Sequence, residues 1–161
     1  MAHTPTVINQ VDMFARSLDD AVEEVFRLMM GLRCFPVDEC PAEDPEMVSA
    51  VIGLAGAMSG ICVLCCGKSV ALRMAETMTE ISVMRVDDTV KDAVGEICNM
   101  VAGAWKAKLP SLASECMLST PTVITGTSYQ LHYQRPECRI ERSYCCEKVS
   151  FTVILLCESM Q

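Results

Sequence analysis

Apolar side chains recur at three- and four-residue steps over two long stretches of the chain, and this spacing predicts amphipathic helices. The first stretch runs from Ile8 to Leu32, where Gly31 is suited to end a helix. The second runs from about Asp88 to Leu109 and is ended by Pro110. A shorter helix is expected between them, with Ser69 as its N-cap. Its predicted buried face consists of Val70, Met74, Ala75, Met78 and Ile81.

The stretch from Met47 to Gly67 carries no charge over 21 residues and is long enough to cross a bilayer. Four of these residues are glycines and two are serines, a poor composition for a lone helix. Two buried strands, Val48 to Ala55 and Gly60 to Cys66, account for the pattern better. We therefore expect a β-hairpin here and no membrane span.

The chain after Pro110 is rich in β-forming residues. Three strands are expected, over Cys116 to Thr127, Tyr129 to Arg135 and Val149 to Cys157. A hairpin and helices followed by strands predict an α+β fold, with a mainly antiparallel sheet and helices packed on one face. With 161 residues, of which 51% are hydrophobic, the chain fits one domain, residues 1–161.

Charge and cysteine content indicate which partners are excluded and in which cellular compartment the protein is expected. The net charge of -8 argues against nucleic acid as a partner. The eleven cysteines are odd in number and include the adjacent pairs Cys65-Cys66 and Cys145-Cys146, which disfavours a disulfide framework. The N-terminus lacks the pattern of a secretory signal, so we expect a cytoplasmic protein whose cysteines are reduced and pack as small core hydrophobes.

Three motifs have simple structural explanations. Gly67-Lys68-Ser69 lies between a strand and a helix, as in a phosphate-binding loop, but Cys62 stands where such a loop has its first glycine. Cys62 and Cys65 have the spacing of zinc ligands, yet residues three apart on a strand point to opposite faces. His132 alternates with the tyrosines of its predicted strand, and the chain has only two histidines, so a nucleophilic triad has no obvious source.

The helix from Asp88 to Leu109 separates cleanly into two faces. Its apolar face consists of Val90, Val94, Ile97, Val101 and Trp105. Its polar stripe consists of Asp92, Glu96, Asn99, Gly103 and Lys106. A solvated face is the simplest interpretation, but asparagine and glycine both weaken a helix interior, which favours a face that docks on a partner. Asp92 and Glu96 could also act as an acid–base pair or as two metal ligands.

At this helix the sequence resembles the CheC/CheX/FliY family of chemotaxis phosphatases. The family signature is Asp or Ser, three residues, Glu, two residues and Asn, with a proline some two dozen positions further on. Here it reads Asp92-Ala-Val-Gly-Glu96-Ile-Cys-Asn99, with Pro121 as the proline. CheC-type members of the family carry two such helices, whereas only one Glu-x-x-Asn is present here, so the sequence is more similar to the single-site CheX type.

The resemblance implies a homodimer with a CheX/CheC-like fold that hydrolyses the aspartyl phosphate of a CheY-like receiver domain. Asn99 would orient the attacking water, Glu96 would pair with the receiver's active-site lysine, and Asp92 and Gly103 would support docking. The receiver would bring the Mg²⁺, so no cofactor is expected in this chain. The alternative is a noncatalytic adaptor of the same fold that binds a receiver or a motor-switch component. A cysteine-based metal or redox protein is a more distant possibility.

Overall fold

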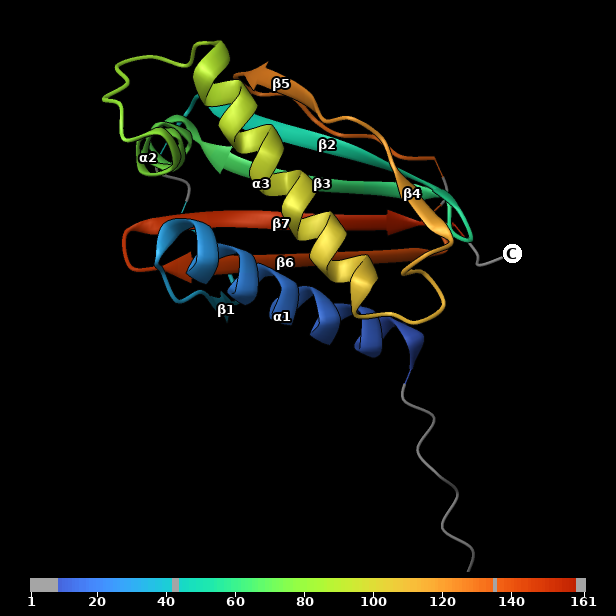
Figure 1. The fold of residues 1–161 in the computed structure, drawn as a ribbon. Coiled ribbons are helices and arrows are strands. Elements are labelled where there is room, and N and C mark those ends of the chain that lie inside the picture. The colour runs from blue at the N-terminus through green and yellow to red at the C-terminus, as the bar shows by residue number, and fades with distance from the viewer. Residues whose placement is uncertain (1–8, 42–43, 135, 159–161) are drawn as a thin grey trace, which may run out of the picture.

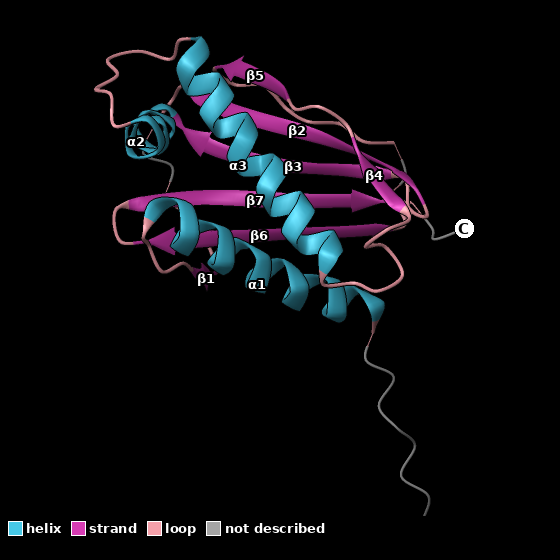
Figure 2. Cartoon of the chain, viewed as in Figure 1, coloured by secondary structure: helices cyan, strands magenta, loops and turns pink. Residues whose placement is uncertain are grey.

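The computed structural model describes residues 9–41, 44–134 and 136–158. In these residues, three helices cover one face of a seven-stranded antiparallel sheet (Figures 1 and 2). The helices are α1 (Gln10–Met30), α2 (Lys68–Thr79) and α3 (Asp88–Ala107). The strands are β1 (Phe35–Val37), β2 (Met47–Gly56), β3 (Gly60–Gly67), β4 (Cys116–Leu118), β5 (Thr122–Gly126), β6 (Cys138–Cys146) and β7 (Val149–Cys157). The predicted α+β class and its one-sided helix layer are confirmed.

The first helix begins and ends close to the predicted residues. The Asn9 side chain accepts a hydrogen bond from the backbone N–H of Val11 and caps the N-terminus of α1. Gly31 ends the helix in the left-handed conformation, with φ of 65°, which glycine adopts at low cost. Ile8, the predicted start, lies outside the described residues.

The predictions for α2 were wrong at both ends. The N-cap position is Gly67 rather than Ser69. Glycine has no side chain to accept a first-turn N–H, and the Asp44 carboxylate accepts the backbone N–H of Ser69 in its place. The helix ends at Thr79, and Glu80 takes a left-handed conformation with φ of 59°. Ile81 therefore leaves the helical register and is 62% exposed rather than buried.

The predicted hairpin forms the centre of the sheet, in which the strand order is β1-β6-β7-β3-β2-β4, with β5 also paired to β2. On β2, the alternate residues Val48, Ala50, Ile52 and Leu54 are buried, as the period of a strand requires. Both hairpin strands have paired neighbours on both sides, and nearly all of their residues are buried or half-buried, which explains their lack of charge. Among the described residues, no helix combines the length and apolar character needed to cross a membrane.

The strand predictions after α3 succeeded only in part. Val149–Cys157 forms β7 as predicted, whereas Cys116 to Thr127 divides into β4 and β5. The predicted strand over Tyr129 to Arg135 was wrong: residues 129–134 form no strand, and Arg135 is not described. Tyr129, Leu131 and Tyr133 are nonetheless half-buried in alternation with exposed neighbours, so the pattern reflects burial without strand pairing.

The sequence also did not reveal β6, which lies between β1 and β7. Its charged residues obscure the alternating apolar pattern that would predict a strand, because they make tertiary contacts or face solvent. Arg142 binds the Asp19 carboxylate of α1 through two of its nitrogens, and the Tyr144 hydroxyl donates to the same carboxylate at 2.8 Å. A second contact at the helix layer joins α1 to α3, where the Trp105 indole N–H donates to the Phe14 carbonyl at 3.2 Å. These contacts fix the helix layer on the sheet.

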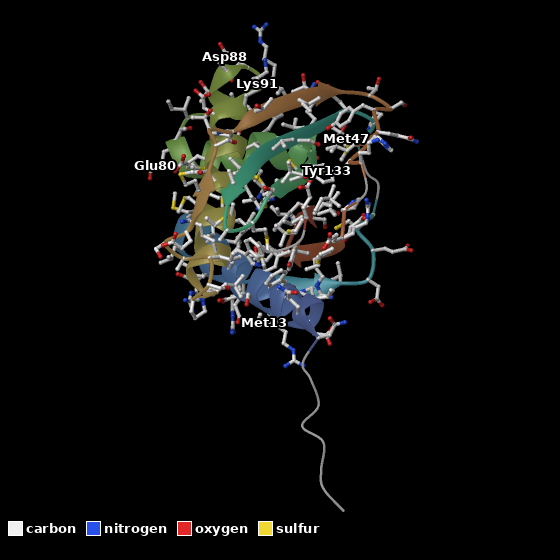
Figure 3. The ribbon with its side chains drawn as sticks, turned by 90° about the vertical axis from the view of Figure 1, so that its right-hand side faces the viewer. Met13, Met47, Glu80, Asp88, Lys91 and Tyr133 are labelled. Carbon is white, nitrogen blue, oxygen red and sulfur yellow. A yellow bond between two sulfur atoms is a disulfide. The ribbon has the colours of Figure 1, made fainter. Side chains whose placement is uncertain are left out.

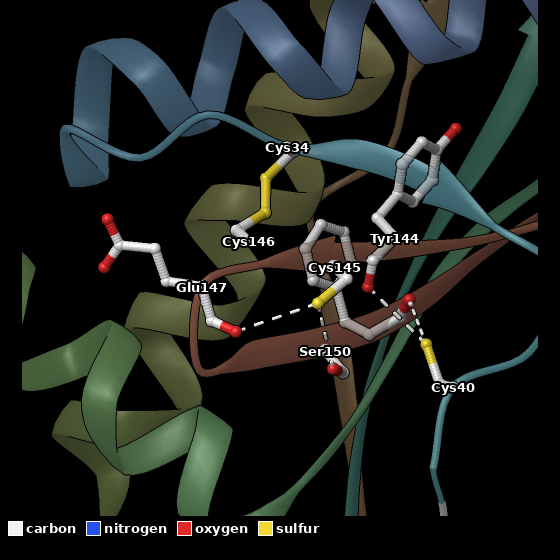
Figure 4. The surroundings of a disulfide bond; sticks show 8 residues. Cys34, Cys40, Tyr144, Cys145, Cys146, Glu147 and Ser150 are labelled. Atoms are coloured by element: carbon white, nitrogen blue, oxygen red, sulfur yellow. Dashed lines mark hydrogen bonds between the residues drawn. A yellow bond between two sulfur atoms is a disulfide. The ribbon is translucent and has the colours of Figure 1, made fainter.

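A disulfide joins Cys34 to Cys146, so the expectation that all the cysteines are reduced was wrong (Figure 4). The pairing follows from the sheet register. Phe35 lies opposite Cys145 in the antiparallel β1–β6 pair, and continuing that register by one residue places Cys34 opposite Cys146, with their Cα atoms 4.4 Å apart. The prediction failed because β6 was not recognised.

Most of the other thiols behave as predicted. Five free cysteines are buried: Cys62, Cys66, Cys98, Cys116 and Cys157. Burial raises the pKa of the Cys157 thiol to about 12, which keeps it neutral at physiological pH. These cysteines therefore pack as small hydrophobic side chains.

Breaking the Cys34–Cys146 disulfide should lower the free energy of unfolding by about 2–4 kcal/mol, because the bridge closes a long loop in the unfolded chain. Urea unfolding of Cys34→Ala/Cys146→Ala, and of the wild type with and without a reductant, measures this effect. Cys145→Ala removes a half-exposed free thiol next to the bridge and is the control. Equal midpoints with and without reductant would contradict the expectation.

Candidate functional site

The third helix is a rigid support for the candidate site. Its N-terminus is capped by Asp87, whose carboxylate accepts a hydrogen bond from the Val90 backbone N–H at 3.1 Å. The helix crosses the sheet diagonally, with one face against it (Figure 1). The five predicted apolar residues, Val90, Val94, Ile97, Val101 and Trp105, are all buried. This packing fixes which residues point away from the sheet.

The polar stripe of α3 lies opposite the buried face of the helix, and its predicted exposure is confirmed in part. Asp92 and Glu96 are exposed, while Asn99 and Gly103 are half-buried. Within the described part of the chain, the side chains of Asp92, Glu96 and Asn99 make no hydrogen bond or ion pair. A half-buried amide with free donors and acceptors can bind an incoming group without first breaking an internal bond.

Lys106, the last residue of the predicted stripe, has a structural role instead. Its ammonium group donates to the carbonyl oxygens of Ala113 and Cys116 at 2.9 and 2.8 Å. These bonds tie the end of α3 to the loop that leads into β4. The residues available to a partner are therefore Asp92, Glu96, Asn99 and Gly103.

Pro121, the proline of the signature, packs directly against the motif helix. A Cβ atom at Gly95 would lie 3.2 Å from both Cβ and Cγ of Pro121 and 3.6 Å from a methyl group of Val123. Gly95 directly precedes Glu96 and lies one turn before Asn99. The missing side chain thus allows the edge of the sheet to approach α3 closely beside the two motif residues, an arrangement that the sequence analysis missed.

Gly103 is different, because its surroundings leave room for a side chain. A Cβ atom there would meet only the Leu118 Cδ1 atom, at an ordinary contact distance of 3.9 Å. The fold of this chain therefore does not require a glycine at position 103. This is compatible with the expectation that Gly103 serves the approach of a partner, which stays a prediction.

The exposed charge near the site is mostly acidic. Asp88, Asp92 and Glu96 follow one another at four-residue steps and so share one side of the helix. Lys91 pairs with Asp88 at 3.7 Å, leaving Asp92 and Glu96 without a cation among the described residues. The site is therefore suited to a cationic group on a partner. Across the described residues, no cluster of three or more histidine, cysteine or acidic side chains could hold a metal ion.

The Gly67-Lys68-Ser69 segment has its amides occupied by the chain itself. The Lys68 backbone N–H donates to the Glu46 carbonyl, and that of Ser69 donates to the Asp44 carboxylate, both at 2.9 Å. The bond from Ser69 lowers the pKa of Asp44 and keeps this carboxylate charged. A phosphate group would have to displace a fixed negative charge, so the segment is a helix start rather than a phosphate site.

The Cys62-x-x-Cys65 pair and His132 form no shared site. Cys62 is buried on the helix-covered side, where its carbonyl accepts a weak bond from the Cys98 thiol. Cys65 points to the other side of the sheet and accepts a bond from the Ser49 hydroxyl at 3.3 Å. His132 is exposed on the segment that links β5 to β6. The polar stripe of α3 remains the best candidate site.

These features define an α+β protein that presents a free acid and a free amide on one exposed helix face. Comparison with known families then places the chain: the family model described as chemotaxis phosphatase CheX matches residues 48–143, which is more than half of the sequence and includes the whole motif helix. The chain therefore belongs to the CheX family, as its resemblance suggested.

Individual relatives agree with this assignment. The CheY-P phosphatase CheX of Thermotoga maritima is 28% identical over 90 residues, which span 55% of this chain and 58% of that protein. The crystal structure of CheX from Vibrio vulnificus aligns with a TM-score of 0.78 at 23% identity, over 93% of this chain and 99% of the other. The CheX of a CheX-CheY-BeF3-Mg²⁺ complex from Borrelia burgdorferi aligns with a TM-score of 0.72 at 19% identity, over 91% and 98% of the two chains.

Replacing the two glycines of α3 by alanine should have different effects on stability. Gly103→Ala should raise the free energy of unfolding by up to about 1 kcal/mol, because alanine favours the helix and the position has room. Gly95→Ala should lose most or all of that gain to the contact with Pro121. Thermal and urea unfolding of both variants would test the difference, and equal stabilisation would contradict the tight packing of Gly95.

Proposed function

We propose that this protein is a phosphatase that hydrolyses the aspartyl phosphate of a CheY-like receiver domain. The observation that carries the proposal is the free Glu96–Asn99 pair on the exposed face of a rigid helix, in a chain of the CheX family. The Thermotoga relative is named a CheY-P phosphatase, and the Borrelia structure contains CheY, which supports the same class of substrate here.

Asn99 would supply the positioning that the reaction needs. Its side-chain carbonyl can accept a hydrogen bond from water while its NH₂ group donates to a phosphoryl oxygen. The water oxygen then attacks phosphorus, the bond from phosphorus to the aspartyl oxygen breaks, and the products are inorganic phosphate and a free aspartate. An amide does not take up the proton of the water, so the contribution of Asn99 is alignment of the reactants.

Glu96 would fix the orientation of the two proteins. A carboxylate without an internal partner can form a charge-assisted hydrogen bond with the lysine of the receiver's active site. Asn99, three residues further along the same helix, would then face the phosphoryl group. The receiver would bring its own Mg²⁺ with the phosphoaspartate, so this chain needs only to add the amide and the ion pair.

Asn99→Ala should lower the rate of phosphate release by about 100-fold, because the attacking water loses its alignment. Binding of the phosphorylated receiver should change little. The measurement is release of radiolabelled phosphate from receivers charged with acetyl phosphate. Asn9→Ala changes the only other asparagine of the chain, a helix cap, and is the control. A wild type that binds the receiver without accelerating hydrolysis would instead identify a noncatalytic adaptor.

Glu96→Gln should raise KM for the phosphorylated receiver by about tenfold, because it removes one charge of the proposed ion pair and keeps the size of the side chain. Salt should then raise KM of the wild type more steeply than KM of the variant. Asp92→Asn, one turn earlier on the same exposed side, is the comparison and should have a smaller effect. Identical salt dependence in wild type and Glu96→Gln would reject the ion pair.

A further inference from the structure

The connection between α2 and α3 displays two large apolar side chains to solvent. Ile81 is 62% exposed and Met84 is 87% exposed, the highest value among the large hydrophobic residues of the described chain. The connection lies beside the N-terminal end of α3, and Figure 3 places Glu80 and Asp88, near its two ends, on the side of the molecule that carries the helices. The connection therefore lies on the helix-covered side of the molecule, next to the helix that carries the candidate site.

The connection is held by specific contacts. The Val83 backbone N–H donates to the Glu76 carboxylate at 3.1 Å, and the Ile81 N–H donates to the Thr79 hydroxyl at 3.3 Å. Val83, between Ile81 and Met84, and Val86, two residues after Met84, pack against the core. The segment thus turns two valines inward and leaves Ile81 and Met84 outward, in a conformation that the fold itself imposes.

We propose that Ile81 and Met84 form an apolar docking patch for the receiver domain whose phosphoaspartate is served by Glu96 and Asn99. The inference rests on the proposed function and extends it to a second contact area. Large exposed hydrophobic side chains on an anchored segment favour contact with another protein. Their burial is favourable, and a segment that is already held in place loses little conformational entropy on binding.

The apolar patch and the Glu96–Asn99 site are close enough for one receiver domain to contact both. Asn99 follows Asp88 by eleven helical steps, a length of about 16 Å, whereas a small domain is about 30 Å across. Met84 precedes Asp88 by only four residues. A domain that presents its phosphoaspartate to Asn99 and extends along α3 toward the helix N-terminus would therefore reach the connection.

The two areas would contribute different physical terms to binding. The unpaired carboxylates of α3 favour a cationic group and set the orientation of the partner. The apolar patch adds affinity that depends little on salt, and the flexible Met84 side chain can adapt to the surface it meets. The patch would thus help to select which receiver is bound.

The test is steady-state phosphate release with purified receivers charged with acetyl phosphate. Ile81→Ser/Met84→Ser should raise KM by at least tenfold and leave kcat and the salt dependence of KM unchanged, whereas Asn99→Ala acts on kcat. Ile81→Leu/Met84→Leu should restore KM, because it keeps the apolar surface. Leu28→Ser, which removes a 69% exposed leucine from α1, is the matched control and should leave KM unchanged. Circular dichroism and the thermal midpoint would establish that each variant is folded.

The outcomes separate this inference from the proposed function. A wild type that hydrolyses no receiver phosphate rejects the proposed function and this patch with it. An active wild type whose KM is unchanged in Ile81→Ser/Met84→Ser rejects the patch alone. If that variant instead dissociates a wild-type dimer, as measured by light scattering, the patch belongs to a second copy of this chain and the inference is also overturned.

Discussion

The packing of α3 against the central strands determines the properties of the candidate site. The buried side of the helix, from Val90 to Trp105, fixes its rotation about its own axis, and this rotation turns Glu96 and Asn99 away from the sheet. The cap at Asp87 and the bonds made by Lys106 hold the two ends. Because these constraints come from the core and the ends, the side chains of Asp92, Glu96 and Asn99 do not have to hold the helix, and they make no hydrogen bond or ion pair within the described residues.

The features that could be predicted from the sequence are those set by local periodicity. The apolar spacing of α1 and α3 and the uncharged glycine-rich hairpin produced correct elements, because each reflects burial of neighbouring residues in the chain. The strand β6 could not be predicted from local periodicity, because its charged residues, such as Arg142, bind side chains far away in the sequence. The same failure concealed the disulfide, since Cys34 and Cys146 are brought together only by the pairing of β1 with β6.

In the candidate site, too, the features set within one helix could be predicted, whereas the contacts between elements could not. The stripe containing Asp92, Glu96 and Asn99 is a property of one helix, so its exposed face followed from the spacing alone. The contact of Gly95 with Pro121 joins two elements and could not be derived from that spacing. Ile81 was assigned to a buried helix face because nothing in its neighbourhood marked the left-handed turn at Glu80.

The position of both motif residues on one helix has a consequence for divergence among related proteins. Their separation is fixed by the helical repeat, so changes elsewhere in the domain do not alter it as long as the helix persists. Substitutions that remodel the core or the surrounding strands can therefore accumulate while the acid and the amide keep their spacing. This geometry is compatible with structural neighbours that retain the fold at only 19–23% identity.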